Sequence, residues 1–236
     1  MSLRPHRAHA ADEARQLCPL SAFDDCPRGR RIAYDVAVPS DIVVLAPSLP
    51  LTTTTHVRST LVASSFLAVR QRGLDGRYFE HLPSPFHQTI LTITPGEWLP
   101  IELGVAHYGA CDSLGLTPHE QFEIGAQVGA RLFGTWLGTL VRIAKGVGVT
   151  PWTGLAQYGR LHQGLFRGGG IAVHQLGPKE ARVDLLGLAF ARFGYFRNVF
   201  RGNNHATVSL FSRRSFISEM PALCSNTRVS LRLAWA

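Results

Sequence analysis

The stretch IAVHQLGPKEARVDLL, residues 171–186, marks the point where the sequence changes from helical to strand-like patterning. Two runs of strand-forming residues, 171–176 and 180–186, flank Gly177-Pro178, a dipeptide that is typical of turns. In the second run apolar and polar residues alternate, which is the two-residue period of a half-buried strand. We therefore predict a β-hairpin at this point of the chain.

The residues after the hairpin predict one helix and two further strands. Residues 190–201 place Phe193, Phe196 and Phe200 on one helical face and arginines on another. Asn203-Asn204 is typical of a turn, and residues 207–216 and 227–235 read as strands. The C-terminal part is therefore predicted to run β-β-α-β-β.

The residues before the hairpin predict helices. The strongest local signal is Thr117-Pro118-His119-Glu120, a capping box with proline in the first helical position, and it predicts a long helix to about residue 145. Apolar residues recur at helical spacing in three other segments, 61–73, 99–115 and 151–166. The expected fold class is α+β: N-terminal helices, then β-β-α-β-β, with helices covering one face of an antiparallel sheet.

Residues 1–56 differ in composition from the rest of the chain. They contain six prolines and a charged cluster at 28–31, and only Ile42–Leu45 suits a strand. We expect a flexible or loosely attached N-terminal extension over 1–56 and a single α+β domain resembling ligand-binding domains over 57–236.

Composition excludes several classes of protein. Hydrophobic residues make up 45% and charged residues 17% of the 236 positions, as in a packed globular domain. No apolar run reaches the roughly 20 residues that a membrane-spanning helix needs. The four cysteines form no C-x-x-C pair, which favours a reducing compartment, the cytoplasm, over a disulfide or zinc framework. The net charge of +8 suits nucleic-acid or acidic partners, and equally simple solubility.

The usual catalytic signatures are missing from the sequence. There is no phosphate-binding loop, dinucleotide fingerprint, nucleophile elbow or zinc-protease motif, so an enzyme is not the favoured interpretation. His107 and Cys111 stand four residues apart and could form half of a metal site or a Cys–His pair. A buried thiol beside a core histidine is the commoner arrangement, so we predict neither a metal nor a catalytic residue.

Two groups of residues leave alternatives open. Gly125, Gly129, Gly134 and Gly138 lie in the long predicted helix and favour close packing against another helix, or against a bound molecule. Three arginines of the predicted strands are expected to share the outer face of the sheet, where they could bind an anion or a partner or simply face solvent; they are Arg182, Arg228 and Arg232.

Three segments carry a resemblance to known proteins: WLPIEL at 98–103, the small-residue helix over 125–136, and LGPKEA at 176–181. On these the chain resembles, over about 60–236, a group of myxobacterial paralogous proteins of unknown function that are distantly similar to the vinyl-reductase-type small-molecule-binding domain. That domain type is related in fold to haem nitric-oxide-binding-associated domains and to subunits of the TRAPP complex. The resemblance implies a regulatory, ligand-sensing or assembly module, with dimerisation as an option, and not an enzyme.

The chain departs from these relatives at two places. Residues 223–227 lack the Gly-Asp-bearing cysteine hairpin of vinyl-reductase-type domains. Tyr158-Gly159-Arg160 does not supply the Tyr-x-Ser-x-Arg element that haem nitric-oxide sensors carry. No haem and no other cofactor is therefore predicted.

The first functional hypothesis is a non-catalytic sensor or binding module with an apolar pocket between its helices and its sheet. The residues expected to line the pocket are Trp136, Tyr158, Phe193 and Phe196, and Arg160 is expected to pair with an acidic group of the ligand. A protein-interaction or dimerisation module without a small ligand is the alternative. Nucleic-acid binding is a third, resting on the charge and on the aromatic and arginine residues of 190–201.

Overall fold

The structure of the chain is a computed structural model, in which residues 42–45, 52–144 and 150–236 are described. Side-chain surroundings are described for 52–131 and 150–236. Within the predicted extension, β1 (Ile42–Leu45) pairs antiparallel with β5, and the Thr54 amide donates to the Gly187 carbonyl at 2.9 Å. These residues are therefore parts of the folded unit. The rest of the segment 1–51 lies outside the described residues, and the expected loose attachment stays a prediction there.

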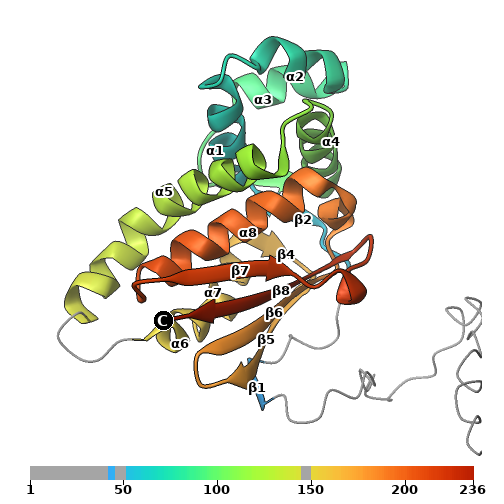
Figure 1. Cartoon of the computed structure of the whole chain (residues 1–236). Coiled ribbons are helices and arrows are strands. Elements are labelled where there is room, and N and C mark those ends of the chain that lie inside the picture. The colour runs from blue at the N-terminus through green and yellow to red at the C-terminus, as the bar shows by residue number, and fades with distance from the viewer. Residues whose placement is uncertain (1–41, 46–51, 145–149) are drawn as a thin grey trace, which may run out of the picture. The chain divides into compact units, whose positions relative to one another are not determined.

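The C-terminal half is built on an antiparallel sheet with the strand order β1-β5-β6-β8-β7. The predicted hairpin is confirmed as β5 (Gly170–Gly177) and β6 (Glu180–Leu186). Helix α8 (Gly194–Ser209) then leads to β7 (Ser215–Glu219) and β8 (Arg228–Trp235). Strand β8 inserts between β6 and β7, so β7 forms one edge of the sheet (Figure 1). The predicted order β-β-α-β-β is confirmed.

Two sequence-based boundaries in this half are wrong. The helix predicted over 190–201 is a short 3-10 turn, η2 (Ala189–Arg192), followed by α8, which continues through Asn203-Asn204. The strand predicted to begin at 207 begins at Ser215. The two asparagines do not form a turn, because the helix continues through them: Asn204 Nδ2 donates to the Phe200 carbonyl at 2.8 Å, and the Asn203 backbone carbonyl accepts from Thr207 Oγ1 at 2.9 Å.

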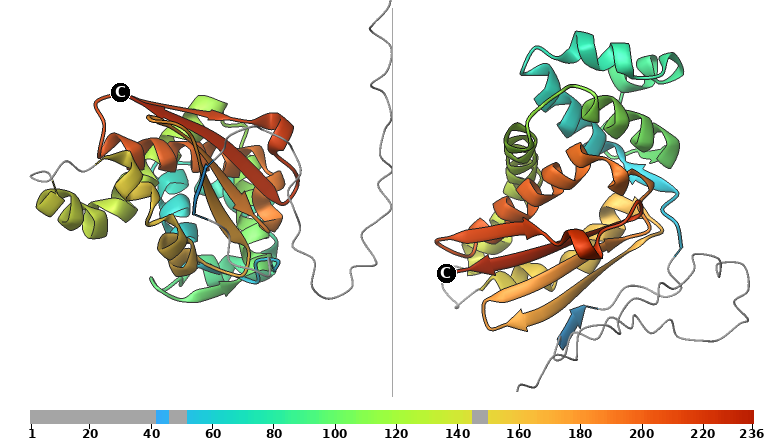
Figure 2. Two further views of the ribbon diagram at one scale, coloured as in Figure 1. Left: turned by 90° about the horizontal axis from the view of Figure 1, so that it is seen from below. Right: turned by 45° about the vertical axis from the view of Figure 1, so that its right-hand side comes forward.

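The N-terminal half packs helices above this sheet (Figure 2). Its elements are α1 (Ser59–Arg70), α2 (Asp75–His81), η1 (Ser84–Phe86), α3 (His87–Leu91) and α4 (Ile101–Asp112). A second, three-stranded sheet has the order β3-β2-β4, with β2 (His56–Arg58), β3 (Trp98–Pro100) and β4 (Phe166–Arg167). No sequence pattern predicts these strands, because two or three residues are too few to show a period.

The long helix α5 (Pro118–Ala144) begins at the predicted capping box. The Thr117 amide donates to Glu120 Oε2 at 2.7 Å, and the Glu120 amide donates to Thr117 Oγ1 at 3.3 Å. The helix predicted over 151–166 is instead two short helices, α6 (Pro151–Leu155) and α7 (Tyr158–Leu165). Among the described residues, no helix is long and apolar enough to cross a membrane.

Helices α5 and α8 touch through their backbones. A methyl group added at Gly125 would lie 2.0 Å from the Val199 carbonyl oxygen, and one added at Gly202 would lie 2.0 Å from the Phe122 carbonyl oxygen. At Gly129 the nearest atom would be the Asn203 Cα, at 3.0 Å. Close helix packing at Gly125 and Gly129 is therefore confirmed. The surroundings of the other two glycines of this group lie outside the described residues.

Candidate ligand-binding site

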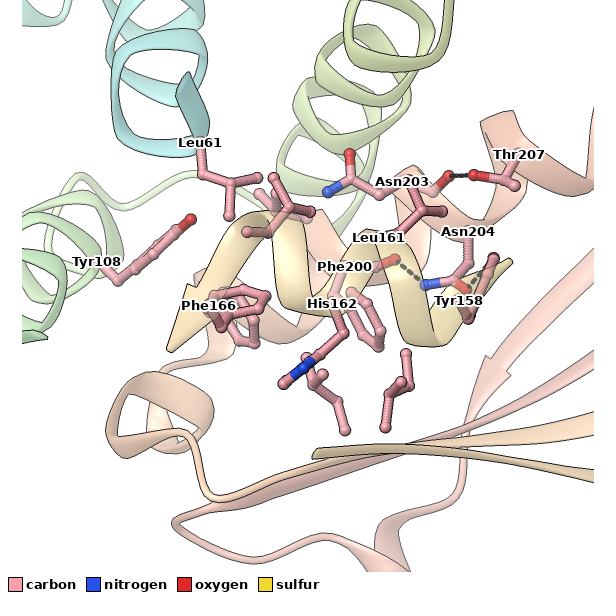
Figure 3. A pocket seen from close by; sticks show the side chains of 15 residues that line it. Leu61, Tyr108, Tyr158, Leu161, His162, Phe166, Phe200, Asn203, Asn204 and Thr207 are labelled. Carbon is pink, nitrogen blue, oxygen red and sulfur yellow. Dashed lines mark hydrogen bonds between the residues drawn. The ribbon is translucent and has the colours of Figure 1, made fainter. Parts of the chain in front are cut away.

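A partly open cavity lies between helices α7 and α8 and the inner face of the large sheet (Figure 3). Its volume is about 70 Å³, and its walls come from α1, α4, α7, β4, β5, β6 and α8. Helix α7 lies against β5, and helix α8 lies against β7 and β8. The cavity is thus built by elements from both halves of the chain.

The walls of the cavity are mainly apolar. Leu161 and Leu165 face it from α7, Ile171 from β5, and Phe196 and Phe200 from α8. The Phe196 and Phe200 rings are stacked, with centroids 6.0 Å apart. Leu161, Leu165 and Phe200 are only half-buried, whereas Phe196 and Ile171 are buried. Such walls favour an apolar ligand, and the half-buried side chains mark the side from which it would enter.

Two polar atoms in this lining have no hydrogen-bond partner although both are buried: His162 Nε2 on α7 and Asn203 Oδ1 on α8. The side chains of Tyr158, Asn204 and Thr207, in contrast, have hydrogen-bond partners. Tyr158 Oη, for example, donates to Asn204 Oδ1 at 2.9 Å. An unpaired polar atom in an apolar site costs about 1–3 kcal/mol, so a ligand that pairs with it gains that energy.

His162 is an uncharged histidine. Figure 3 shows its imidazole between α7 and the sheet, and its ring centroid lies 5.2 Å from that of Phe166. Burial disfavours the imidazolium and lowers the pKa of His162 from 6.5 to about 4. At neutral pH the side chain therefore carries one N–H donor and one free ring nitrogen, which can bond a neutral ligand in either direction.

Of the five residues that the sequence predicts at the site, the structure places two in the cavity lining and two elsewhere, and the fifth has no described side chain. Tyr158 and Phe196 line the cavity. Phe193 does not: it precedes α8 and packs on α4, where a methyl group at Gly109 would lie 3.2 Å from its ring. Arg160 is exposed and contacts Gln157 at 3.5 Å. The side chain of Trp136 lies outside the described residues.

Sequence reasoning missed His162 and Asn203. His162 could have been found, because it follows Tyr158 by four residues on one short helix and so shares its face. Asn203 could not, because it was assigned to a turn between two elements and is in fact part of α8.

His107 and Cys111, the possible metal or nucleophile pair, belong to the core. Tyr78 Oη and His107 Nδ1 are hydrogen-bonded at 2.8 Å, and His107 Nε2 lies 3.8 Å from Cys111 Sγ. Burial lowers the pKa of His107 to about 3 and raises the pKa of Cys111 well above its usual value. A neutral imidazole and a protonated thiol suit a structural role. Within the described residues, no three histidine, cysteine or acidic side chains are grouped to hold a metal.

The arginines of the outer sheet face are engaged in ion pairs. Arg228 Nη2 lies 2.9 Å and Arg182 Nε 3.3 Å from Asp184 Oδ2, and Arg232 bonds Glu180. His174 Nε2 also approaches the Asp184 carboxylate, at 3.2 Å. Ion pairs within the sheet are an arrangement that neither interpretation of this face, anion binding or exposure to solvent, had included.

Comparison with known proteins reveals similarity in fold alone. No family model and no curated protein matches the chain. Solved structures of H-NOX domains do match: an Fe(II) unliganded H-NOX protein from K. algicida has a TM-score of 0.55 and 10% identity, covering 75% of this chain and 95% of that one.

Two further matches are of the same kind. A structure from a study of heme distortion in the H-NOX family has a TM-score of 0.54, 12% identity and coverage of 75% and 94%. An oxygen-binding H-NOX domain related to soluble guanylate cyclases has a TM-score of 0.50, 14% identity and the same coverage. The α+β fold is thus of the H-NOX type. The resemblance to the myxobacterial group has no match among family models and stays a prediction.

Proposed function

We propose that this chain is a non-catalytic binding module that takes up a small, largely apolar molecule in the cavity between α7, α8 and the sheet. The observation that carries the proposal is the pair of unpaired polar atoms, His162 Nε2 and Asn203 Oδ1, in a mainly apolar lining. A ligand with one hydrogen-bonding group and an apolar body matches that pattern. The fold supports it, since the similar structures include an oxygen-binding H-NOX domain and one from a study of heme distortion in the H-NOX family.

The described cavity does not fit a haem. One feature agrees with haem binding: His162 offers an unpaired, uncharged ring nitrogen of the kind that ligates haem iron. However, a cavity of roughly 150 Å³ holds a single benzene ring, and about 70 Å³ is far too small for a tetrapyrrole. The described lining also contains no lysine or arginine to pair with haem carboxylates. A molecule of a few heavy atoms is the better match.

The chain's residues would act on such a ligand in two ways. The leucine, isoleucine and phenylalanine walls exclude water and bind the apolar part. His162 orients the polar part, and because its pKa is about 4 it does so as a neutral group throughout the physiological range. Ligand contacts with α8 would change the position of that helix, which is how binding would be signalled.

Two probes that differ in polarity test the proposal. Full-length protein with ¹³C-labelled leucine, isoleucine and valine methyl groups is titrated with xenon, which is purely apolar, and with 1-propanol, which adds one hydroxyl. We expect both to shift the methyl signals of Ile171, Leu161 and Leu165, because these side chains line the cavity. Propanol is expected to bind more tightly than xenon.

Two variants sharpen the assignment. His162→Phe keeps a ring but removes the unpaired nitrogen, so propanol should bind about tenfold more weakly while xenon binding is retained. Leu67→Met, at an exposed position on α1, is the matched control and should change neither propanol binding nor xenon binding. If neither probe shifts the lining methyl groups, the proposed pocket is wrong. If the wild-type protein and His162→Phe bind propanol equally tightly, His162 does not bond the ligand.

A further inference from the structure

A groove runs along the free edge of β7, in a different place from the cavity. It holds about 620 Å³ and is lined by three elements: the first turns of α5, the middle of α8 and residues 215–218 of β7. Four consecutive strand residues line it, so the groove follows the backbone of the strand. The strand forms one side and Pro118 and Phe122 of α5 lie on the other. A groove between an edge strand and a helix is the geometry in which proteins bind extended peptides.

The hydrogen-bond register shows which backbone groups this edge offers. Arg214 and Ala236 exchange both of their backbone hydrogen bonds, and the Met220 amide donates to the Ser230 carbonyl. Because bonding alternates along an antiparallel pair, the even-numbered residues of β7 bond to β8. The N–H and C=O groups of Ser215, Ile217 and Glu219 therefore point outward. Among the described residues no strand pairs with them.

The edge strand lacks two of the residues that usually protect such an edge, proline and lysine. β7 reads SFISE, with neither proline nor lysine, and Phe216 is 64% exposed. Proteins commonly block an open edge with such residues because it otherwise pairs with another chain. An open edge with an exposed aromatic side chain is suited to receive an added strand.

The charge of the groove identifies the chemistry of its occupant. Arg201 lines the groove, and its Nε is buried without a hydrogen-bond partner. His119 and His205 line it as well, and Arg213 and Arg214 are exposed just before β7. No carboxylate is found among the described lining residues. Acidic side chains close in sequence to the lining residues have partners: Glu123 lies 3.4 Å from His119, Glu219 lies 3.2 Å from Arg197, and Glu120 accepts from Thr117.

We propose that the groove binds an extended segment of a partner protein, which adds a strand to the outer edge of β7 and places a carboxylate against Arg201. The backbone of Ile217 would supply the strand hydrogen bonds, and Phe216 would pack on an apolar side chain of the partner. The carboxylate would accept from the unpaired Arg201 Nε. This proposal does not depend on the cavity.

A designed peptide pair tests both parts of the proposal. The probe is a fluorescein-labelled peptide of seven residues, alternating valine and threonine with a central glutamate; its partner has glutamine at the centre. Binding to the full chain is measured by fluorescence anisotropy. We expect the glutamate peptide to bind and the glutamine peptide to bind about tenfold more weakly.

Three variants separate the edge from the charge. Ile217→Pro removes an outward N–H without removing a bond between β7 and β8, so it should abolish binding. Arg201→Gln should bind the glutamate peptide about tenfold more weakly and make the two peptides equivalent. Arg160→Gln, on the exposed side of α7, is the matched control and should bind as the wild-type protein does.

Several results would overturn the proposal. Failure of the glutamate peptide to bind the wild-type protein is one such result. Equal binding of the two peptides by the wild-type protein is another, because it would show that no carboxylate is recognised at this edge. A concentration-dependent dimer in light scattering that Ile217→Pro abolishes would assign the edge to a second copy of the chain instead. Should Ile217→Pro not fold, the response of Arg201→Gln decides the outcome alone.

Discussion

The crossing of α5 and α8 yields the sharpest prediction of stability. In Gly125→Ala the new methyl group would lie 2.0 Å from the Val199 carbonyl oxygen and 2.7 Å from the Val199 Cα. These are backbone atoms, so no side chain can turn aside and the helices must separate by roughly 1 Å. Overpacking costs typically 1–3 kcal/mol, and the backbone contact points to the upper end, about 3 kcal/mol. Alanine regains about 1 kcal/mol of helix propensity, leaving a net loss of about 2 kcal/mol.

The measurement is urea unfolding of the full chain, followed by circular dichroism. A loss of about 2 kcal/mol corresponds to a melting temperature lowered by roughly 4–8 °C in a protein of this size. Gly164→Ala is the matched control, because it also lies in a helix but has no atom within 4 Å of the added methyl group. It should be neutral or stabilising by up to about 1 kcal/mol. If both variants are equally stable, the backbone contact between α5 and α8 is wrong.

Three further predictions concern single interactions, each measured by urea unfolding. Thr117→Ala removes the hydroxyl of the capping box and should cost about 1 kcal/mol; Ser in its place should restore most of the loss. Tyr78→Phe leaves His107 Nδ1 buried without its partner and should cost about 1–3 kcal/mol, and an unchanged stability would contradict the hydrogen bond. Burial alone would raise the pKa of Asp184, but hydrogen bonds from His174 and Ser230 and two arginine charges lower it to about 2. The wild-type protein should therefore lose stability as the pH falls from about 4 to 2, and Asp184→Asn should lack that part of the loss.

The sequence was informative where a local pattern extends over several residues. The hairpin β5–β6 and the start of α5 follow from alternation and from the capping box, which are properties of short segments. The glycines at 125 and 129 indicated a close helix contact, although not that α8 is the partner. The strands β2 and β4 were not predicted, because segments of two or three residues acquire strand geometry only by pairing with their partners.

The site was predictable only in part, for geometric reasons. Tyr158 and Phe196 lie on the inner faces of their helices, as their spacing indicates. Phe193 falls out of this series because α8 begins one residue later, so the helical spacing from Phe193 to Phe196 does not apply. Arg160 is two residues from Tyr158 and so points away from it. The unpaired atoms that characterise the cavity depend on tertiary packing, which no local pattern encodes.

The direct backbone contacts between α5 and α8 at their glycines have a mechanical consequence. Between two packed helices, side chains can usually change rotamer and so accommodate a small displacement of one helix without moving the other. Where Gly125 contacts Val199 and Gly202 contacts Phe122, no side chain lies between the two backbones to make this adjustment. A shift of α8, whose residues form one wall of the cavity, would therefore reach α5 directly at these contacts. Helix α5 has 27 residues and is roughly 40 Å long. A small tilt of α5 at its contact with α8 would therefore move the far end of the helix by a larger distance.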